Sequence, residues 1–113
     1  MANVSTIVME NGGFASLAAN LAVIATATPL TGYVNTVTSA DASNVAVALP
    51  YLPGGGGPIV VHSVSTDGLT VFPGASTVSI NGATAGDAFT IGANKTAKFW
   101  QVSPTAVMAI LGA

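Results

Sequence analysis

Turn-forming residues divide the last two-thirds of the chain into short runs that are rich in Val, Ile, Thr and Phe. Asp67-Gly68 and Asn81-Gly82 are pairs that type I′ hairpin turns prefer, because both central residues of that turn need a positive φ. Pro73-Gly74 and Gly92-Ala93-Asn94 are also turn signals, and the glycines at 54–57 are expected to form an exposed loop. Short segments bounded in this way predict β-structure.

The runs between the turns have the length and composition of β-strands, because β-branched and aromatic residues favour extended structure. About eight runs follow one another roughly 8–12 residues apart, which is typical of a β-sandwich or barrel. We therefore expect an all-β fold: a single compact antiparallel β-sandwich or barrel, jelly-roll-like, over residues 32–113, with an N-terminal arm over residues 1–31. The expected strands are residues 33–38, 45–49, 59–64, 69–72, 78–80, 88–91, 96–102 and 107–111.

Side-chain alternation predicts how each strand is covered. Residues 45–49 alternate large and small side chains, which favours a strand with one buried face. Residues 59–64 show no clean alternation, as is typical of a strand covered on both faces. Phe99 and Trp100 are neighbours, so a strand should bury one and expose the other. We expect them to pack in the core and on the sheet face, and a ligand platform is the alternative.

The first residues form a segment with scattered apolar anchors that ends at Gly12-Gly13. It has too little periodicity to close a core of its own, so we expect the arm to order on a neighbouring subunit or a larger assembly. A short strand over residues 1–13 is the alternative. The expected contact residues of the arm are Val4, Ile7, Val8, Phe14, Leu17 and Leu21.

Two conformations remain open for residues 14–27. Leu17, Leu21 and Ile24 have helical spacing, and the alanines among them favour a helix. The Ala-Thr repeat before Pro29 favours an extended segment that adds to a sheet edge.

The scarcity of charge limits the partners of this chain. Charged residues make up 5% of the sequence, against about 25% in an average soluble domain. Such a surface favours assembly with other protein, and an unusually neutral monomer is the alternative. There is no Arg and there are only two Lys, so the basic patch that nucleic acids or anionic membranes would need is missing.

The sequence also predicts no membrane span and no secretory signal. The most apolar stretch, residues 15–30, contains polar residues and Pro29, and it is shorter than the roughly 20 apolar residues of a spanning helix. No basic residue precedes it, whereas a signal peptide has a positive flank. A product of the cytoplasm that joins an assembly fits these features.

Few residues offer chemistry. The absence of Cys excludes disulfides and thiolate ligands, and His62 is the only histidine. Asp67 and Asp87 flank turn glycines, where carboxylates commonly bond backbone amides. No Gly-x-Ser-x-Gly elbow is present, and the glycines at 54–57 lack the Lys of a phosphate loop. We expect no enzymatic activity, catalytic residue, metal or cofactor.

The order of the motifs from residue 45 onward resembles that of the capsid decoration (cement) and head-fibre proteins of tailed phages. The most distinctive element is Leu69-Thr70-Val71-Phe72-Pro73 followed by Ile80-Asn81-Gly82. The resemblance also covers Val45–Pro50, Ile59–His62 and the segment from Phe89 to Phe99. The chain has Val107-Met108 where the family usually has an aromatic residue near the C-terminus. The structural residues that the resemblance marks are Leu49, Pro50, Val71, Pro73, Ile80, Asn81, Gly82 and Phe99.

The resemblance implies a structural protein of the virion, made in the host cytoplasm and bound to the outer capsid surface. Such a protein would bridge major capsid proteins, stabilise the shell and form a homotrimer. The alternative within the same class is a head-fibre or tail-fibre module that contacts the host surface or a glycan. A small glycan hydrolase is a third reading, and it would need an acid and base pair in a cleft.

Overall fold

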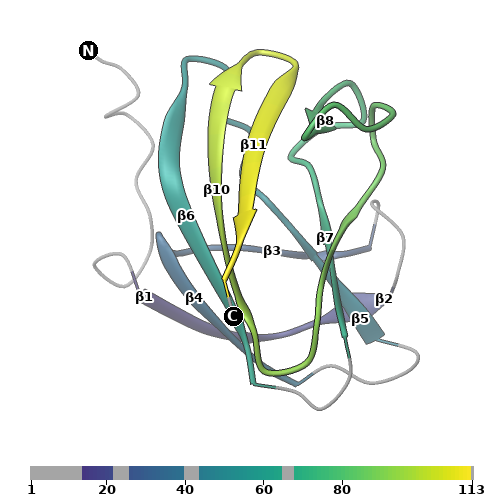
Figure 1. The fold of residues 1–113 in the computed structure, drawn as a ribbon. Helices are drawn as coiled ribbons and strands as arrows, with labels where there is room; N and C mark the ends of the chain where they lie inside the picture. The colour runs from purple at the N-terminus through teal and green to yellow at the C-terminus, as the bar shows by residue number, and fades with distance from the viewer. Residues whose placement is uncertain (1–13, 22–25, 40–43, 65–67, 113) are drawn as a thin grey trace.

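A computed structural model describes residues 14–21, 26–39, 44–64 and 68–112, and these residues are all-β (Figure 1). Their strands form two mixed sheets, and no helix occurs in these ranges. The strands are β1 (Phe14–Ala18), β2 (Asn20–Leu21), β3 (Thr28–Pro29), β4 (Val34–Ser39), β5 (Asn44–Ala48), β6 (Gly56–Ser63), β7 (Leu69–Phe72), β8 (Ser79–Ile80), β9 (Phe89–Ile91), β10 (Thr96–Ser103) and β11 (Ala106–Leu111).

The six-stranded sheet has the order β1-β4-β6-β10-β11-β8. Strands β1, β4 and β6 run parallel, and Phe14, Val34 and Val60 are register partners across them. Strand β10 is antiparallel to both β6 and β11, and β8 pairs parallel with the far side of β11. The β10–β11 hairpin closes through Pro104 and Thr105, between the segments 96–102 and 107–111 that were expected to be strands.

The five-stranded sheet has the order β2-β5-β7-β9, with β3 also paired to β5. Strand β5 is parallel to β3 and β7, and antiparallel to β2. Hydrogen bonds from Leu30 N to Ala48 O (2.9 Å) and from Leu49 N to Phe72 O (2.9 Å) continue these two parallel ladders past the strand ends.

The chain changes sheet at every connection from β3 to β10. Strands β4 and β6 lie in one sheet, and β5 and β7 lie in the other. The chain therefore winds around the core: β4 and β5 form one winding, and β6 and β7 form the next. Each strand of the second winding pairs in parallel with the corresponding strand of the first. The expectation of antiparallel sheets was therefore wrong, and both sheets are mixed. A turn signal shows where the chain reverses, but it does not show whether the next strand joins the same sheet or the other one.

Asp67-Gly68 illustrates the same correction. The predicted hairpin would pair β6 with β7, but these strands belong to different sheets. Gly68 also lacks the positive φ that a type I′ turn requires. Asp67 itself lies outside the described residues.

The described part of the predicted arm takes part in both sheets. Residues 14–18 pair with β4, and residues 20–21 and 28–29 pair with β5. For residues 14–21 the extended alternative is therefore correct and the helical one is not. Residues 1–13 lie outside the described part of the chain.

One hydrophobic core receives side chains from both sheets. Phe99 of β10 is 1% exposed, and its ring meets that of Phe89 from β9 edge to face, with centroids 5.5 Å apart. Phe99 is buried as predicted for one member of the pair, whereas Trp100 on the opposite face is half-buried and not fully exposed. The other large side chains of the core are Leu30, Val37, Val47, Leu49, Leu52, Ile59, Val61, Leu69, Val71, Val78, Ile80, Ile91 and Val107.

Two strands are covered differently from the sequence expectation. Ala46 and Val47 are both fully buried, so β5 is covered on both faces there. In β6, buried Ile59, Val61 and Ser63 alternate with half-buried Val60 and His62. The sequence does not show this alternation, because Val60 is apolar although its side chain lies on the face away from the core.

Among the described residues, the buried polar side chains have hydrogen-bond partners with one exception. Asn35 is fully buried; its Oδ1 accepts from Gly32 N (3.0 Å) and its Nδ2 donates to the carbonyl oxygens of Gly32 (2.7 Å) and Val60 (3.2 Å). The Nε2 of buried Gln101 donates to Ser103 O (2.8 Å). The Oγ of Ser63 is buried without a hydrogen-bond partner.

Part of the glycine run 54–57 belongs to a strand, which corrects the expected exposed loop. Gly56 and Gly57 begin β6, and Gly56 is the register partner of Gln101. Gly57 has a φ of 126°, and a Cβ there would lie 2.6 Å from Phe99 O and 3.1 Å from Trp100 Cα. The missing side chain thus allows β6 to approach β10 closely.

We predict that Gly57→Ala lowers the free energy of unfolding by at least about 2 kcal/mol, since the new Cβ meets backbone atoms at an unfavourable φ. Gly54→Ala is the matched control, because no atom lies within 4 Å of its added Cβ, and it should change stability by less than about 0.5 kcal/mol. Urea unfolding followed by the fluorescence of the single Trp measures both. Equal stability of the two variants would contradict the proposed close approach.

Candidate functional site

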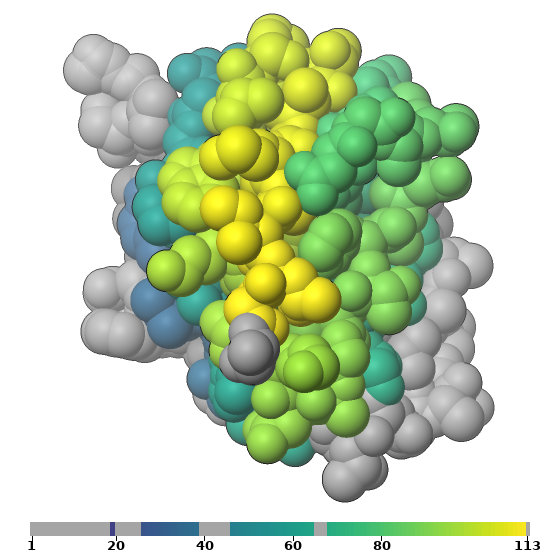
Figure 2. Space-filling view, in the orientation of Figure 1, coloured from purple at the N-terminus to yellow at the C-terminus, as the bar shows by residue number. Residues whose placement is uncertain are grey.

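The six-stranded sheet has an outer face that points away from the core and carries exposed apolar side chains. In β10, buried Ala97 and Phe99 alternate with exposed Lys98 and Val102, as a strand with one buried face requires. Figure 2 shows this face, with β10 and β11 in yellow-green and yellow at its centre. The outer face consists of Val34, Val60, His62, Thr96, Lys98, Trp100, Val102, Met108 and Ile110.

Exposure is highest along the β10–β11 hairpin. Val102 is 59% exposed, Ile110 52% and Met108 43%. The chain has few charged side chains that could keep such an apolar surface soluble. Exposed apolar areas of this kind commonly mark contact with another protein.

The strand register orders these residues into rows. Lys98 is the register partner of both Val60 and Ile110, and Val60 is the partner of Val34. We call Val34, Val60, Lys98 and Ile110 the Lys98 row. Trp100 and Met108 form a neighbouring pair on β10 and β11. The outer face therefore presents one cation surrounded by apolar side chains.

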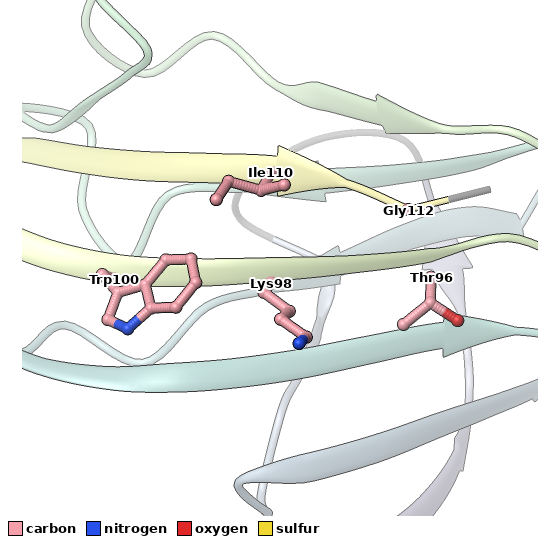
Figure 3. Close-up of a pocket in the computed structure, with 5 residues that line it drawn as sticks. All are labelled: Thr96, Lys98, Trp100, Ile110 and Gly112. Atoms are coloured by element: carbon pink, nitrogen blue, oxygen red, sulfur yellow. The ribbon is translucent and has the colours of Figure 1, made fainter.

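A hollow of about 280 Å³ opens on this face (Figure 3). Thr96, Lys98 and Trp100 line it from β10, and Ile110 and Gly112 line it from the end of β11 and beyond. The Gly112 N–H donates to Thr96 O (2.6 Å), which holds the end of the hairpin together. This volume is close to that of the smallest pockets that bind small ligands, and it could hold one or two side chains of a partner.

Lys98 is exposed, and within the described ranges its ammonium group makes neither an ion pair nor a hydrogen bond. Asp87 is the only acidic residue in those ranges, and it is exposed on the turn that Asp87 N closes with Thr84 O (3.0 Å). The turn expected at Asp87 is thus present. Lys98 therefore offers an unpaired positive charge beside the hollow.

The chemistry of His62 on this face is limited. Its Nδ1 lies 2.7 Å from the hydroxyl oxygen of Thr96 on the adjacent strand. In the part of the chain that the structure describes, no three His, Cys, Asp or Glu side chains come together as metal ligands would. What the outer face offers is binding through apolar contact and one cation.

The structure places the residues marked by the family resemblance mostly in the core. Leu49, Val71, Pro73, Ile80 and Phe99 are buried, and Pro50 is half-buried. Of the expected arm contacts, Val4, Ile7 and Val8 lie outside the described residues, whereas Phe14, Leu17 and Leu21 pair through the backbone with Val34, Val37 and Asn44.

Sequence reasoning did not identify Lys98, Met108 or Ile110 as part of one surface. Their alternation within residues 96–102 and 107–111 was visible, but the surface also depends on the register of β10 with β11 and β6. That register could not be derived from either segment alone.

Asn81 and Gly82 form a turn, but not the predicted two-strand hairpin. Their φ angles of 53° and 76° are both positive, as expected for a type I′ turn. The Asn81 amide continues the β8–β11 ladder: its Nδ2 donates to Ala109 O (3.0 Å), and its Oδ1 accepts from Ala109 N (2.9 Å). The Asn81 side chain thus makes the hydrogen bonds to β11 that the backbone of one more residue of β8 would make.

The chain matches no protein-family model, and searches of curated proteins and of solved structures also found no match. No helix in the described ranges has the length and apolarity to cross a membrane.

We predict that Asn81→Ala destabilises the protein by about 1–2 kcal/mol more than Asn94→Ala, because it removes two hydrogen bonds from the edge of the sheet. Asn94 is a matched control, since its φ of 55° is nearly the same and carries the same backbone penalty. Chemical denaturation of the two variants beside the parent protein measures the difference. Equal losses would mean that the amide contacts with Ala109 add no stability.

Proposed function

We propose that this chain is a non-enzymatic structural protein of a tailed-phage virion, namely a capsid decoration (cement) protein. It binds the outer capsid surface, bridges major capsid proteins and stabilises the shell. In this proposal the two sheets pack as a β-sandwich, and the residues before β1 serve as an attachment arm.

The observation that carries this proposal is the apolar outer face of the six-stranded sheet. Val102, Met108 and Ile110 are all more than two-fifths exposed, and the whole chain has only two Lys and four acidic residues. A surface of this kind is best satisfied by contact with other protein. The motif order from Leu69 to Phe99 is the reason for choosing the capsid as the assembly.

A fibre module that contacts a host glycan is the second candidate, and one observation favours it. Half-buried Trp100 beside the hollow offers an aromatic face next to Lys98 and Thr96. Aromatic rings of this kind can pack against the apolar face of a sugar, and the neighbouring polar groups could bond its hydroxyls.

The number of copies on purified particles separates the two candidates. We predict that quantitative mass spectrometry finds this chain in numbers comparable with the major capsid protein, since a cement protein repeats with the capsid lattice. Particles stripped of the chain should lose integrity at a lower temperature than complete particles. A few copies at one vertex or at the tail would favour the fibre candidate, and absence from the particle would contradict both.

We also propose that the protein is a homotrimer held by apolar contacts and backbone hydrogen bonds. We predict that native mass spectrometry at low ionic strength and light scattering across a salt series up to the molar range give the same oligomer. Exposed ion pairs contribute only about 0–1 kcal/mol each, and this chain has few charges for salt to screen. Retention on intact particles over the same salt series is the parallel test. A monomer at micromolar concentration, or release at moderate salt, would contradict this proposal.

A further inference from the structure

The turn after β8 combines a reactive pair of residues with a side chain that is held at both of its polar atoms. In an Asn-Gly pair the glycine has no Cβ to obstruct its backbone nitrogen, so this nitrogen can attack the Cγ atom of the preceding asparagine. Asn81 is exposed and is followed by Gly82. Its Oδ1 and Nδ2 both bond to the backbone of Ala109 on β11, at 2.9 and 3.0 Å. A group that can react and the contacts that restrain it therefore lie at the same place.

We propose that Asn81 is a site of spontaneous deamidation that the pairing of β8 with β11 controls. While the two strands are paired, the Asn81 amide does not react. When this edge of the sheet opens, Asn81 converts to aspartate or isoaspartate, and the product does not restore the closed edge. This inference does not depend on a role in the virion.

The reaction needs only this chain and solvent water. The backbone nitrogen of Gly82 attacks Asn81 Cγ and forms a C–N bond, the bond from Cγ to Nδ2 breaks, and ammonia leaves with the proton that the Gly82 nitrogen loses. Water then adds to one of the two carbonyl carbons of the five-membered imide and opens the ring. Addition at the side-chain carbonyl gives aspartate, and addition at the main-chain carbonyl gives isoaspartate.

The contacts of the closed edge oppose the first step. Attack makes the planar Asn81 Cγ tetrahedral and removes Nδ2, so both hydrogen bonds to Ala109 must break. The backbone on each side is held as well, because Asn81 N donates to Val107 O (2.9 Å) and Ala83 N donates to Ile80 O (3.1 Å). The reaction therefore requires β8 and its turn to separate from β11.

The product does not fit the same contacts. An aspartate at this position still accepts from Ala109 N, but a carboxylate oxygen replaces the Nδ2 of Asn81 and faces Ala109 O. Two acceptors cannot form a hydrogen bond, and they repel each other. Isoaspartate also adds one carbon to the main chain at the turn. Deamidation therefore runs in one direction and makes later opening of the edge easier.

A second turn provides a matched comparison. Asn94 is also exposed and has a φ of 55°, against 53° at Asn81, but its side chain makes no hydrogen bond to the other described residues. Lys95→Gly places a glycine after Asn94, so one folded molecule then carries two exposed Asn-Gly pairs of which only Asn81 is restrained. Asn11→Gln, included in every variant, removes the other Asn-Gly pair of the sequence.

Incubation of the folded Lys95→Gly variant in warm, mildly alkaline buffer tests the proposal, with peptide mapping by mass spectrometry as the readout. We expect Asn94 to deamidate at least about tenfold faster than Asn81, since only Asn81 must first give up two hydrogen bonds. In urea that unfolds the chain, the two positions should react at similar rates. Equal rates in the folded protein, or a slower Asn81 in urea as well, would overturn the proposal.

The same comparison is available without Lys95→Gly if that variant does not fold. Asn81 in the protein that carries only Asn11→Gln should react at least about tenfold more slowly when folded than in urea. Equal rates in the two conditions would overturn the proposal.

The effect of the product on the edge has its own test. Asn81→Asp reproduces the aspartate product, and Asn94→Asp adds the same charge at the unrestrained turn. The Ser79 N–H of β8 donates to Thr105 O (2.9 Å), so its exchange with solvent, followed by NMR, reports the opening of the edge. We expect Asn81→Asp to speed this exchange at least about fivefold, since one hydrogen bond is lost, and Asn94→Asp to leave it unchanged. Unchanged exchange in Asn81→Asp would overturn the claim that deamidation weakens the edge.

Discussion

The parallel stacking of successive windings is the constraint on which the rest of this structure depends. Strands β1, β4 and β6 align in one sheet, and β3, β5 and β7 align in the other, so each winding takes its register from the one before it. This stacking places the side chains of both sheets in a single core. It also sets the position of β6, and through β6 the antiparallel β10–β11 hairpin that carries the outer face.

The junction of β6 with β10 links the core to the candidate site. Gly57 allows the backbone of β6 to lie against Phe99 and Trp100, which are consecutive residues with opposite environments. Phe99 fills the core and contacts Phe89 of the other sheet, whereas Trp100 lines the hollow. A change that displaces β10 at this point would therefore affect both the packing of the sheets and the shape of the outer face.

Local features of the sequence were sufficient to locate the strands from β4 onward but not to pair them. The run Leu69–Phe72 is β7 with the same bounds, and the two segments around Ser103-Pro104-Thr105 form the β10–β11 hairpin. Both are defined by β-branched residues and turns close by in the chain. The pairing of β4 with β6 joins Val34 to Val60 across an intervening strand of the other sheet, and no local pattern records it. For the same reason the alternation that exposes Lys98 was visible, whereas the row joining it to Val34 and Ile110 was not.

The Asn81 side chain has a consequence for the end of the six-stranded sheet. Strand β8 is only two residues long, and an uncovered strand edge can accept a strand from another molecule. The Asn81 amide uses both the N–H and the carbonyl oxygen of Ala109, which are the groups that an incoming strand would need there. One side chain thus closes this part of the edge to strand addition. A protein with an apolar sheet face can in this way meet its partners face to face while resisting edge-to-edge growth into aggregates.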